Sequence, residues 1–138
     1  MTAAALPASD ITTVLVVDDS AFARQGAIVC LRSAGLANAE FVEAGHGREA
    51  LDRMRQRSVD LVVTDLNMPE MGGLELLRAI KGDSTLRTVD VVVVSSVIGP
   101  AAEAELMNEG ARRVVKKPLS GAGALKMLSA VIQGHDHG

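Results

Sequence analysis

Aromatic side chains are nearly absent from this sequence, which has no tryptophan, no tyrosine and only two phenylalanines, Phe22 and Phe41. Because proteins that bind single-stranded nucleic acids stack bases on aromatic rings, this composition argues against such binding. The formal net charge of -3 is also small, and basic residues adjoin one another only in two short pairs, at 112–113 and 116–117. The sequence therefore lacks the basic surface that binds a nucleic-acid backbone.

Cysteine is equally scarce. Cys30 is the only one, so neither an intrachain disulfide nor a thiolate metal cluster can form, which fits a reducing compartment. The first ten residues lack the basic and long apolar regions of an export signal, and no apolar run approaches membrane-spanning length. We therefore expect a cytoplasmic chain that contacts neither membrane nor nucleic acid.

Aliphatic residues, by contrast, are abundant. With 138 residues and 48% hydrophobic side chains, the chain has the size and composition to fill one core. We expect one domain over residues 11–133. Small and polar residues at 1–10, and glycine and histidine at 134–138, predict flexible tails.

Short runs of β-branched apolar residues alternate with longer segments of helical period. The five runs are Thr13–Val17, Glu40–Glu43, Leu61–Thr64, Val91–Val94 and Arg113–Val115. The helical segments are about 20–33, 47–57, 73–81 and 100–110, with a fifth that follows Ser120. This alternation predicts an α/β fold, in which five parallel strands form a sheet and five helices cover both of its faces.

The helical segments also predict which side chains face the core. In the second segment, the period assigns Ala50, Leu51 and Met54 to the buried face. The apolar residues of the first and fifth segments are expected to do the same, and these are Phe22, Ile28, Val29, Leu31, Leu125, Leu128, Val131 and Ile132.

Polar residues follow four of the five runs. The strand ends read Asp18-Asp19-Ser20, Asp65-Leu66-Asn67, Ser95-Ser96 and Lys116-Lys117-Pro118. In open α/β sheets, ligands bind outside the carboxyl ends of the strands, close to the point where strand order reverses. Taken alone, the aspartates are explained by a cap or turn, Ser95 by the end of a strand and a lysine before proline by solvation. Their coincidence at four strand ends favours a single functional site.

Three carboxylates in this set predict a metal site. At one sheet edge Asp18, Asp19 and Asp65 would repel one another, and a bound cation relieves that repulsion. Oxygen ligands suit Mg²⁺ or Mn²⁺ and give Zn²⁺ no advantage. A hydroxyl from Ser95 and an ammonium from Lys117 complete a set suited to phosphoryl transfer: a nucleophilic oxygen, a metal and fixed donors.

Four segments carry a resemblance to a known family. VLVVDDS (14–20), LVVTDLNMPEMGGLELL (61–77), VVVVSS (91–96) and VVKKPLS (114–120) resemble the receiver domains of two-component response regulators. The match spans Ile11 to Gln133, and the start VVDDSAFARQ most resembles stand-alone chemotaxis (CheY-like) regulators. The resemblance implies a doubly wound, flavodoxin-like sheet with strand order 2-1-3-4-5.

The resemblance also implies roles for the metal-site residues. Asp65 matches the residue that accepts the phosphate. Asp19, Asp65 and the backbone carbonyl of Asn67 match the direct ligands of Mg²⁺, and Asp18 matches the acid that binds it through water.

Further positions match the residues that surround the phosphoryl group. Ser95 matches the hydroxyl residue that contacts this group and shifts on activation, and Lys117 matches the lysine that forms an ion pair with it. Pro118 matches a proline that usually follows a cis bond. Val114, however, stands where the family often has an aromatic residue, so an aromatic rotamer switch is excluded there. Val97 stands where charged or amide side chains often tune the lifetime of the phosphate.

The function implied is that of a phosphorylated signalling protein. A histidine kinase or phosphotransfer protein would supply the phosphoryl group, and a downstream protein would bind the face formed by the fourth helix, fifth strand and fifth helix. The only chemistry expected is self-catalysed phosphoryl transfer and autodephosphorylation. Since no sequence remains for a DNA-binding or enzymatic module, we expect the output on another chain.

Three alternatives remain open from the sequence. A phosphate-independent interaction module would explain Val114 but not the intact acceptor set. An aspartate-nucleophile phosphatase places its nucleophile after the first strand as Asp-x-Asp, a pattern that Asp18-Asp19-Ser20 does not match. In a mononucleotide-binding flavodoxin-like carrier, Asp18 and Asp19 would repel the phosphate of the ligand.

Overall fold

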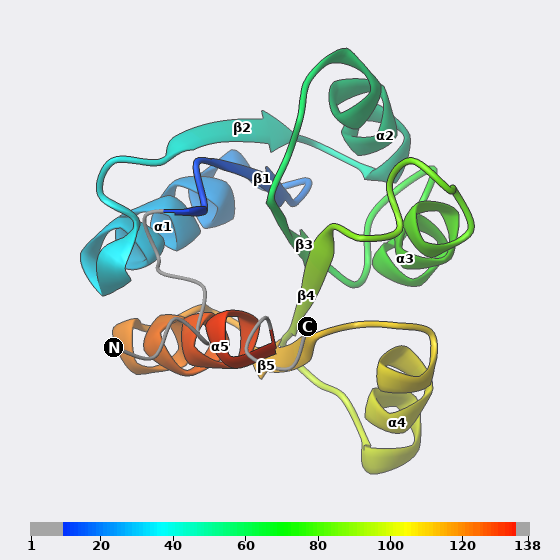
Figure 1. Ribbon diagram of the computed structural model, residues 1–138. Helices are drawn as coiled ribbons and strands as arrows, with labels where there is room; N and C mark the ends of the chain where they lie inside the picture. The colour runs from blue at the N-terminus through cyan, green and yellow to red at the C-terminus, as the bar shows by residue number, and fades with distance from the viewer. Residues whose placement is uncertain (1–9, 135–138) are drawn as a thin grey trace.

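Five parallel strands form one sheet in the order β2-β1-β3-β4-β5 (Figure 1). The computed structural model describes residues 10–134, so most of the two predicted tails, 1–9 and 135–138, lies outside the described residues. The strand bounds are β1 (Thr13–Val17), β2 (Glu40–Ala44), β3 (Leu61–Asp65), β4 (Asp90–Ser95) and β5 (Arg113–Lys116). The predicted strands and their order are confirmed, and the observed ends differ from the predicted ones by one residue or none.

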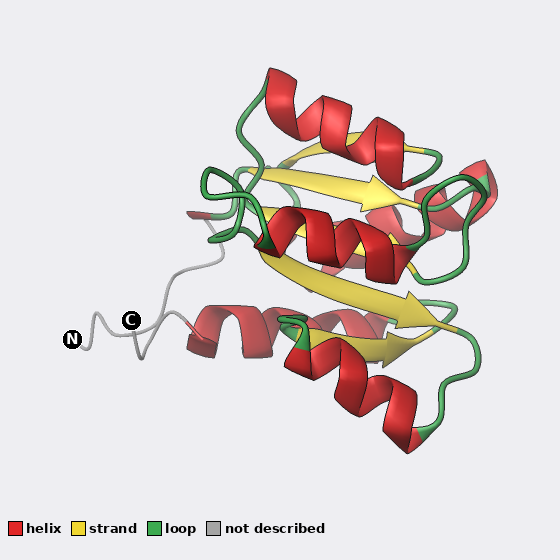
Figure 2. Cartoon of the chain, turned by 90° about the vertical axis from the view of Figure 1, so that its right-hand side faces the viewer, coloured by secondary structure: helices red, strands yellow, loops and turns green. Residues whose placement is uncertain are grey.

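Helices cover both faces of this sheet (Figure 2). They are α1 (Ala21–Leu31), α2 (Gly47–Gln56), α3 (Gly73–Lys81), α4 (Pro100–Asn108) and α5 (Gly121–Gly134). α1 and α5 lie on one side, whereas α2, α3 and α4 lie on the other (Figure 1). None of the helices in the part of the chain described here is long and apolar enough to cross a membrane.

Two hydrophobic clusters hold the layers together, one on each face of the sheet. Successive residues of a strand point to opposite faces, so Leu15 and Val62 join the cluster under α2 and α3. Val16 and Val63 join the cluster under α1 and α5. β1, β3 and β4 are buried along their whole length because helices cover both faces. The carboxyl ends of these strands therefore have fixed positions, and the polar residues that follow the strands start from these positions.

Side chains cap two helices, α1 and α5, as the sequence predicts. Ser20 Oγ accepts a hydrogen bond from Ala23 N at 3.2 Å at the start of α1. Ser120 Oγ accepts one from Gly123 N at 2.9 Å at the start of α5. α1 continues into a short π-helical segment, η2 (Arg32–Leu36), which the sequence did not predict.

Three predictions about buried side chains are wrong. Phe22 and Val29 of α1 are 90% and 62% exposed, and Leu125 of α5 is 58% exposed. Both helices carry apolar residues almost all round, so their period does not define a single face. The core side of α1 is built from Ile28 and Leu31, as predicted. That of α5 combines the predicted Leu128 and Val131 with Met127 and with Ala124, which was not predicted.

Candidate functional site

The three predicted carboxylates meet at the carboxyl edge of the sheet. Asp18 follows β1, and Asp65 is the last residue of β3, its neighbour in the sheet. One carboxylate oxygen from each of Asp18, Asp19 and Asp65 lies within 4.8 Å of the other two. Asp18 and Asp65 are only 6% and 9% exposed, whereas Asp19 is exposed. The fold thus brings two buried acids and one exposed acid together.

Backbone groups hold one oxygen of each buried carboxylate. Asp18 Oδ1 accepts a hydrogen bond from Ser20 N at 2.9 Å, and Asp65 Oδ1 accepts one from Leu66 N at 2.9 Å. The main chain of Asp18 is held as well, since its N–H donates to the carbonyl of Ala44 at 3.1 Å. These contacts leave Oδ2 of each acid directed toward the end of β5.

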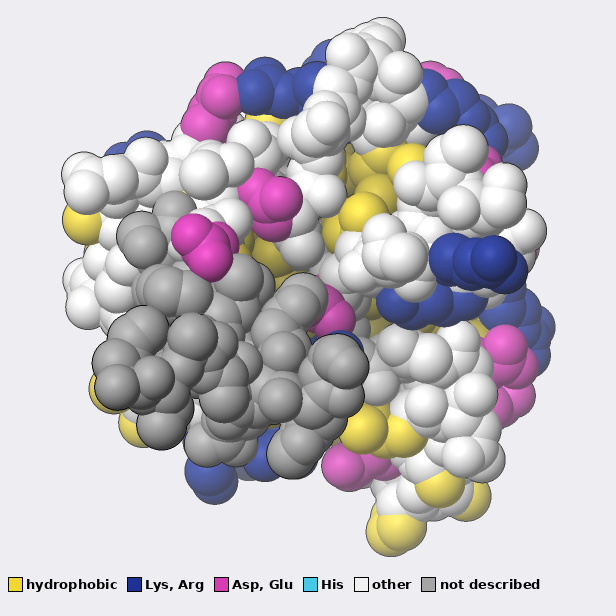
Figure 3. All heavy atoms as spheres, in the orientation of Figure 1, with side chains coloured by type: hydrophobic (Ala, Val, Ile, Leu, Met, Phe, Trp, Pro, Cys, Tyr) yellow, Lys and Arg dark blue, Asp and Glu magenta, His cyan; other side chains and the backbone are white. Residues whose placement is uncertain are grey.

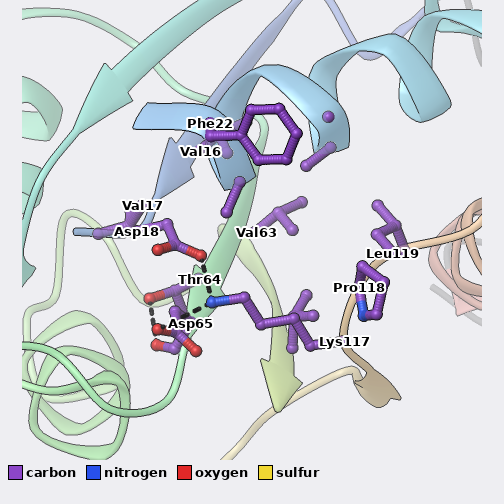
Figure 4. A pocket seen from close by; sticks show the side chains of 14 residues that line it. Val16, Val17, Asp18, Phe22, Val63, Thr64, Asp65, Lys117, Pro118 and Leu119 are labelled. Carbon is purple, nitrogen blue, oxygen red and sulfur yellow. Dashed lines mark hydrogen bonds and ion pairs between the residues drawn. The ribbon is translucent and has the colours of Figure 1, made fainter. Parts of the chain in front are cut away.

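Lys117, which follows β5, occupies the space between the two buried acids (Figure 4). Its Nζ lies 2.8 Å from Asp18 Oδ2 and 3.4 Å from Asp65 Oδ2. The bond between Lys117 and Pro118 is cis, as the resemblance implies. The same three charged side chains line a cavity of about 160 Å³, whose other walls are mostly apolar and include Phe22.

Electrostatics in this cluster are unbalanced. Burial raises the pKa of the Asp65 carboxyl, the charge of Asp18 raises it further, and Lys117 opposes both. Burial lowers the pKa of Lys117, but the hydrogen bond and charge of Asp18, together with Asp65, outweigh it and leave this pKa raised. One ammonium therefore faces three carboxylates. An excess of hard oxygen donors fits a divalent cation such as Mg²⁺ or Mn²⁺.

Ser95 and Asn67 lie at and just beyond the carboxyl ends of β4 and β3. Ser95 ends β4 and is 3% exposed, and its Oγ donates to the carbonyl of Val97 at 3.1 Å. The hydroxyl is thus engaged with the loop that leads to α4. Asn67 is exposed in the loop between β3 and α3, two residues beyond Asp65.

The loop that carries Asn67 packs tightly against the strand end. Gly73 N donates to Leu66 O at 2.7 Å. A Cβ at Gly73 would lie 2.5 Å from the carbonyl oxygen of Asp65, closer than any real contact. Glycine is therefore required here because the backbone of α3 approaches the backbone of β3.

Two residues near the site were not predicted. His46 caps α2, because its Nδ1 accepts a hydrogen bond from Glu49 N at 3.3 Å. Arg24 reaches back from α1 and donates to the carbonyl of Asp18 at 2.6 Å. The only signal for Arg24 in the sequence is a basic residue one helical turn after Ser20, which is too common to single it out.

Comparison with known proteins decides the family. Residues 14–129 match the model of the response regulator receiver domain. The chain belongs to this family. The receiver is 37% identical over 116 residues to the two-component response regulator ORR1 of Oryza sativa, a match that covers 79% of the chain and only 50% of the rice protein. It is 28% identical over 123 residues to chemotaxis protein CheY1 of Helicobacter pylori, covering 88% of the chain and 98% of that protein.

Solved structures give the same family. The receiver is similar to Vibrio cholerae chemotaxis protein CheY4 with a TM-score of 0.77 and 31% sequence identity, covering 88% of the chain and 98% of the CheY4 chain. The flavodoxin-like receiver fold and the CheY-like character expected from the sequence are therefore confirmed. The receiver is part of two-component signalling.

Proposed function

We propose that this receiver accepts a phosphoryl group on Asp65 from the phosphohistidine of a histidine kinase or phosphotransfer protein. The observation that carries the proposal is the convergence of Asp18, Asp19, Asp65 and Lys117 on one sheet edge. Two of these acids are buried beside one ammonium, and buried negative charge in excess of its cationic partners is costly, so the cluster favours a further cation besides Lys117.

The proposed ligands of that cation are oxygen atoms. Asp19, Asp65 and the backbone carbonyl of Asn67 would bind Mg²⁺ directly, and Asp18 would bind it through water; Mn²⁺ suits the same donors. The bound ion supplies positive charge next to the transferring phosphoryl group.

Asp65 is the proposed nucleophile. One of its carboxylate oxygens attacks phosphorus in line, the bond between phosphorus and the donor imidazole nitrogen breaks, and the products are an acyl phosphate and a free histidine. The phosphoryl group carries about -1.5 to -2 charges at pH 7, in place of the single charge of the free carboxylate. Lys117 is near enough to pair with them, and Ser95 can donate to a phosphoryl oxygen once its hydroxyl leaves the carbonyl of Val97.

The proposed output is protein contact on the face of α4, β5 and α5. Hydrophobic side chains are exposed near α4 (Figure 3), among them Val97 at 86% and Met107 at 40%. A shift of Ser95 would move the loop that leads to Pro100 and thus this surface. Val114 is half-buried and aliphatic, so the signal travels through this loop and through packing rather than through a turning ring.

Chemotaxis is the proposed pathway, because both CheY1 and CheY4 are chemotaxis proteins by name. The receiver's own chemistry is limited to self-catalysed phosphoryl transfer and loss. The proposed compartment is the cytoplasm, since a single cysteine fits a reducing environment. A phosphate-independent interaction module is the second candidate, and Val114 is the observation that favours it.

Phosphorylation by a small donor tests the proposal. The chain is incubated with acetyl phosphate, with Mg²⁺ or with EDTA, and its mass is measured. We expect one added phosphoryl group that requires Mg²⁺ and is absent from Asp65→Asn, whereas Asp52→Asn, an exposed control on α2, behaves as the wild type. Equal modification of Asp65→Asn, or modification in EDTA, overturns the proposal.

A further inference from the structure

Arg24 connects three elements at the edge of the site. It lies in the first turns of α1, and its NH1 donates to the carbonyl oxygen of Asp18 at 2.6 Å. Its Nε donates to Oε1 of Glu43, on β2, at 2.8 Å. The side chain of Arg24 is only 19% exposed. A single guanidinium thus joins α1 and β2 to the residue that follows β1.

The position of Glu43 makes this connection rigid. β2 is the neighbour of β1, and Glu43 pairs in register with Val16, two residues before Asp18. Its second oxygen, Oε2, accepts a hydrogen bond from Gln25 Nε2 at 2.9 Å. Both oxygens of the carboxylate are therefore held by adjacent residues of α1, and the planar guanidinium of Arg24 has one orientation in which it reaches both acceptors.

Three hydrogen bonds hold Asp18, through its backbone N–H, its backbone carbonyl and its side chain. Its N–H donates to Ala44 O at 3.1 Å, its carbonyl accepts from Arg24, and its Oδ1 accepts from Ser20 N. Of these contacts, only that of Arg24 comes from a charged donor, and charge-assisted hydrogen bonds are the stronger kind. Since the charge of Arg24 is matched by Glu43, its effect on the Asp18 carboxylate is one of placement rather than of attraction.

We infer that Arg24 is a positioning residue for the metal site: it fixes the turn after β1 so that the carboxylates of Asp18 and Asp19 face Asp65. The inference rests on the proposed function, because it takes these acids as the Mg²⁺ site. Groups that orient metal ligands commonly change metal affinity by about 10- to 100-fold when they are removed. Replacement of Arg24 therefore weakens Mg²⁺ binding by about tenfold or more.

The chain offers a matched control. Arg57, at the end of α2, forms an ion pair with Glu40 at the opposite end of β2. It also joins a helix to β2 through an arginine and a glutamate, but far along the strand from the carboxyl edge. Loss of a general link between helix and sheet therefore affects Arg57→Gln and Arg24→Gln alike, whereas loss of placement affects only Arg24→Gln.

Mg²⁺ titration of the full chain by calorimetry, with unfolding by urea in EDTA as a parallel measurement, tests the inference. We expect Arg24→Gln to weaken binding by about tenfold or more. Arg24→Lys should bind Mg²⁺ as weakly as Arg24→Gln does, because one ammonium cannot reproduce the two directed N–H donors of the planar guanidinium. Glu43→Gln should weaken it by a smaller factor, and Arg57→Gln should stay within about twofold of the wild type.

Two results overturn the inference. One is a folded Arg24→Gln chain that binds Mg²⁺ within about twofold of the wild type. The other is an equal loss of affinity in Arg57→Gln. If Arg24→Gln does not fold, Glu43→Gln decides alone, and unchanged affinity in that variant rejects the role. If the wild type binds no Mg²⁺, or if Asp65→Asn binds Mg²⁺ as tightly as the wild type does, the proposed function is wrong and this inference is wrong with it.

Discussion

The ammonium of Lys117 lies 2.8 Å from Asp18 Oδ2, closer than the 3.4 Å that separates it from Asp65 Oδ2. Lys117 is 27% exposed, whereas the side chains of the two acids are 9% and 10% exposed. In this arrangement the lysine neutralises part of the carboxylate charge and remains partly exposed to solvent. The same ammonium that stabilises the acids in the unmodified receiver is within reach of a phosphoryl group on Asp65.

Removal of the Lys117 ammonium should lower the stability of the metal-free receiver and increase the stabilisation that Mg²⁺ provides. In Lys117→Ala, Asp18 and Asp65 lose their cationic partner, and we expect the free energy of unfolding in EDTA to fall by about 1 to 2 kcal/mol, between the values for exposed and buried pairs. Mg²⁺ should restore more stability to the variant than to the wild type, because no ammonium then repels the ion. Urea unfolding with and without Mg²⁺ measures both effects. An unchanged midpoint in EDTA contradicts this role for Lys117.

The raised pKa of Asp65 predicts how the metal-free receiver responds to pH. Burial, and then the charge of Asp18, raise this pKa above the ordinary value of 3.8. The folded state thus holds the proton more tightly than the unfolded chain does. The contribution of Asp65 to stability is therefore fully present below pH 3.8 and is lost as the pH rises through the folded-state pKa.

A comparison in EDTA isolates this contribution. Asp65→Asn replaces the titrating carboxyl by an amide of the same shape. The stability of this variant relative to the wild type should therefore increase as the pH rises from about 4 to 7. Urea midpoints of both proteins across this range provide the test. A difference that does not change with pH shows that the carboxyl titrates alike in both states.

The close approach at Gly73 predicts a destabilising methyl group. In Gly73→Ala, the new Cβ meets the backbone of Asp65 and Leu66, which cannot rotate away. We expect the free energy of unfolding to fall by about 1 to 3 kcal/mol. Mg²⁺ affinity should fall as well, since the loop with Asn67 must move. Gly26→Ala is the control. Among the described residues, a Cβ added at Gly26 would have no neighbour within 4 Å beyond adjacent residues and its own helix backbone, and alanine should stabilise α1 by about 0.5 to 1 kcal/mol. Equal effects of the two variants on thermal unfolding would refute the packing argument.

Ser95 should couple the phosphoryl group to the loop before α4. Its hydroxyl donates to Val97 O in the present structure and must leave it to reach a phosphoryl oxygen. In Ser95→Ala we expect Mg²⁺ affinity to remain within about twofold, because Ser95 is not a proposed ligand. NMR shifts of residues 97–100 on addition of beryllofluoride should become smaller than in the wild type. Undiminished shifts show that the loop responds without this hydroxyl.

The sequence predicts the sheet well because three of its strands are continuous apolar runs with polar residues at their ends. Those polar residues also identify Asp18, Asp65, Ser95 and Lys117 as neighbours, since parallel strands end at one edge. The helix faces were less predictable. Phe22, Val29 and Leu125 lie on helices with apolar residues almost all round, and the packing of the neighbouring elements decides which side is buried.

Side-chain partners were harder still to predict. That Lys117 lies nearer Asp18 than Asp65, and that Arg24 bonds the carbonyl of Asp18, depends on rotamers and on the relative placement of four strand ends. His46 as the cap of α2 depends on the backbone of a single residue. Local sequence patterns contain no information on such geometry.

Chemical mapping of the phosphorylated residue tests the central claim most directly. The chain is phosphorylated with acetyl phosphate and Mg²⁺, the product is reduced with borohydride, which converts an acyl phosphate on aspartate to homoserine, and the peptides are sequenced by mass spectrometry. We predict homoserine at position 65 and unmodified aspartate at positions 18 and 19. Homoserine at either of those positions instead, or phosphate that resists borohydride, contradicts the assignment of Asp65 as the acceptor.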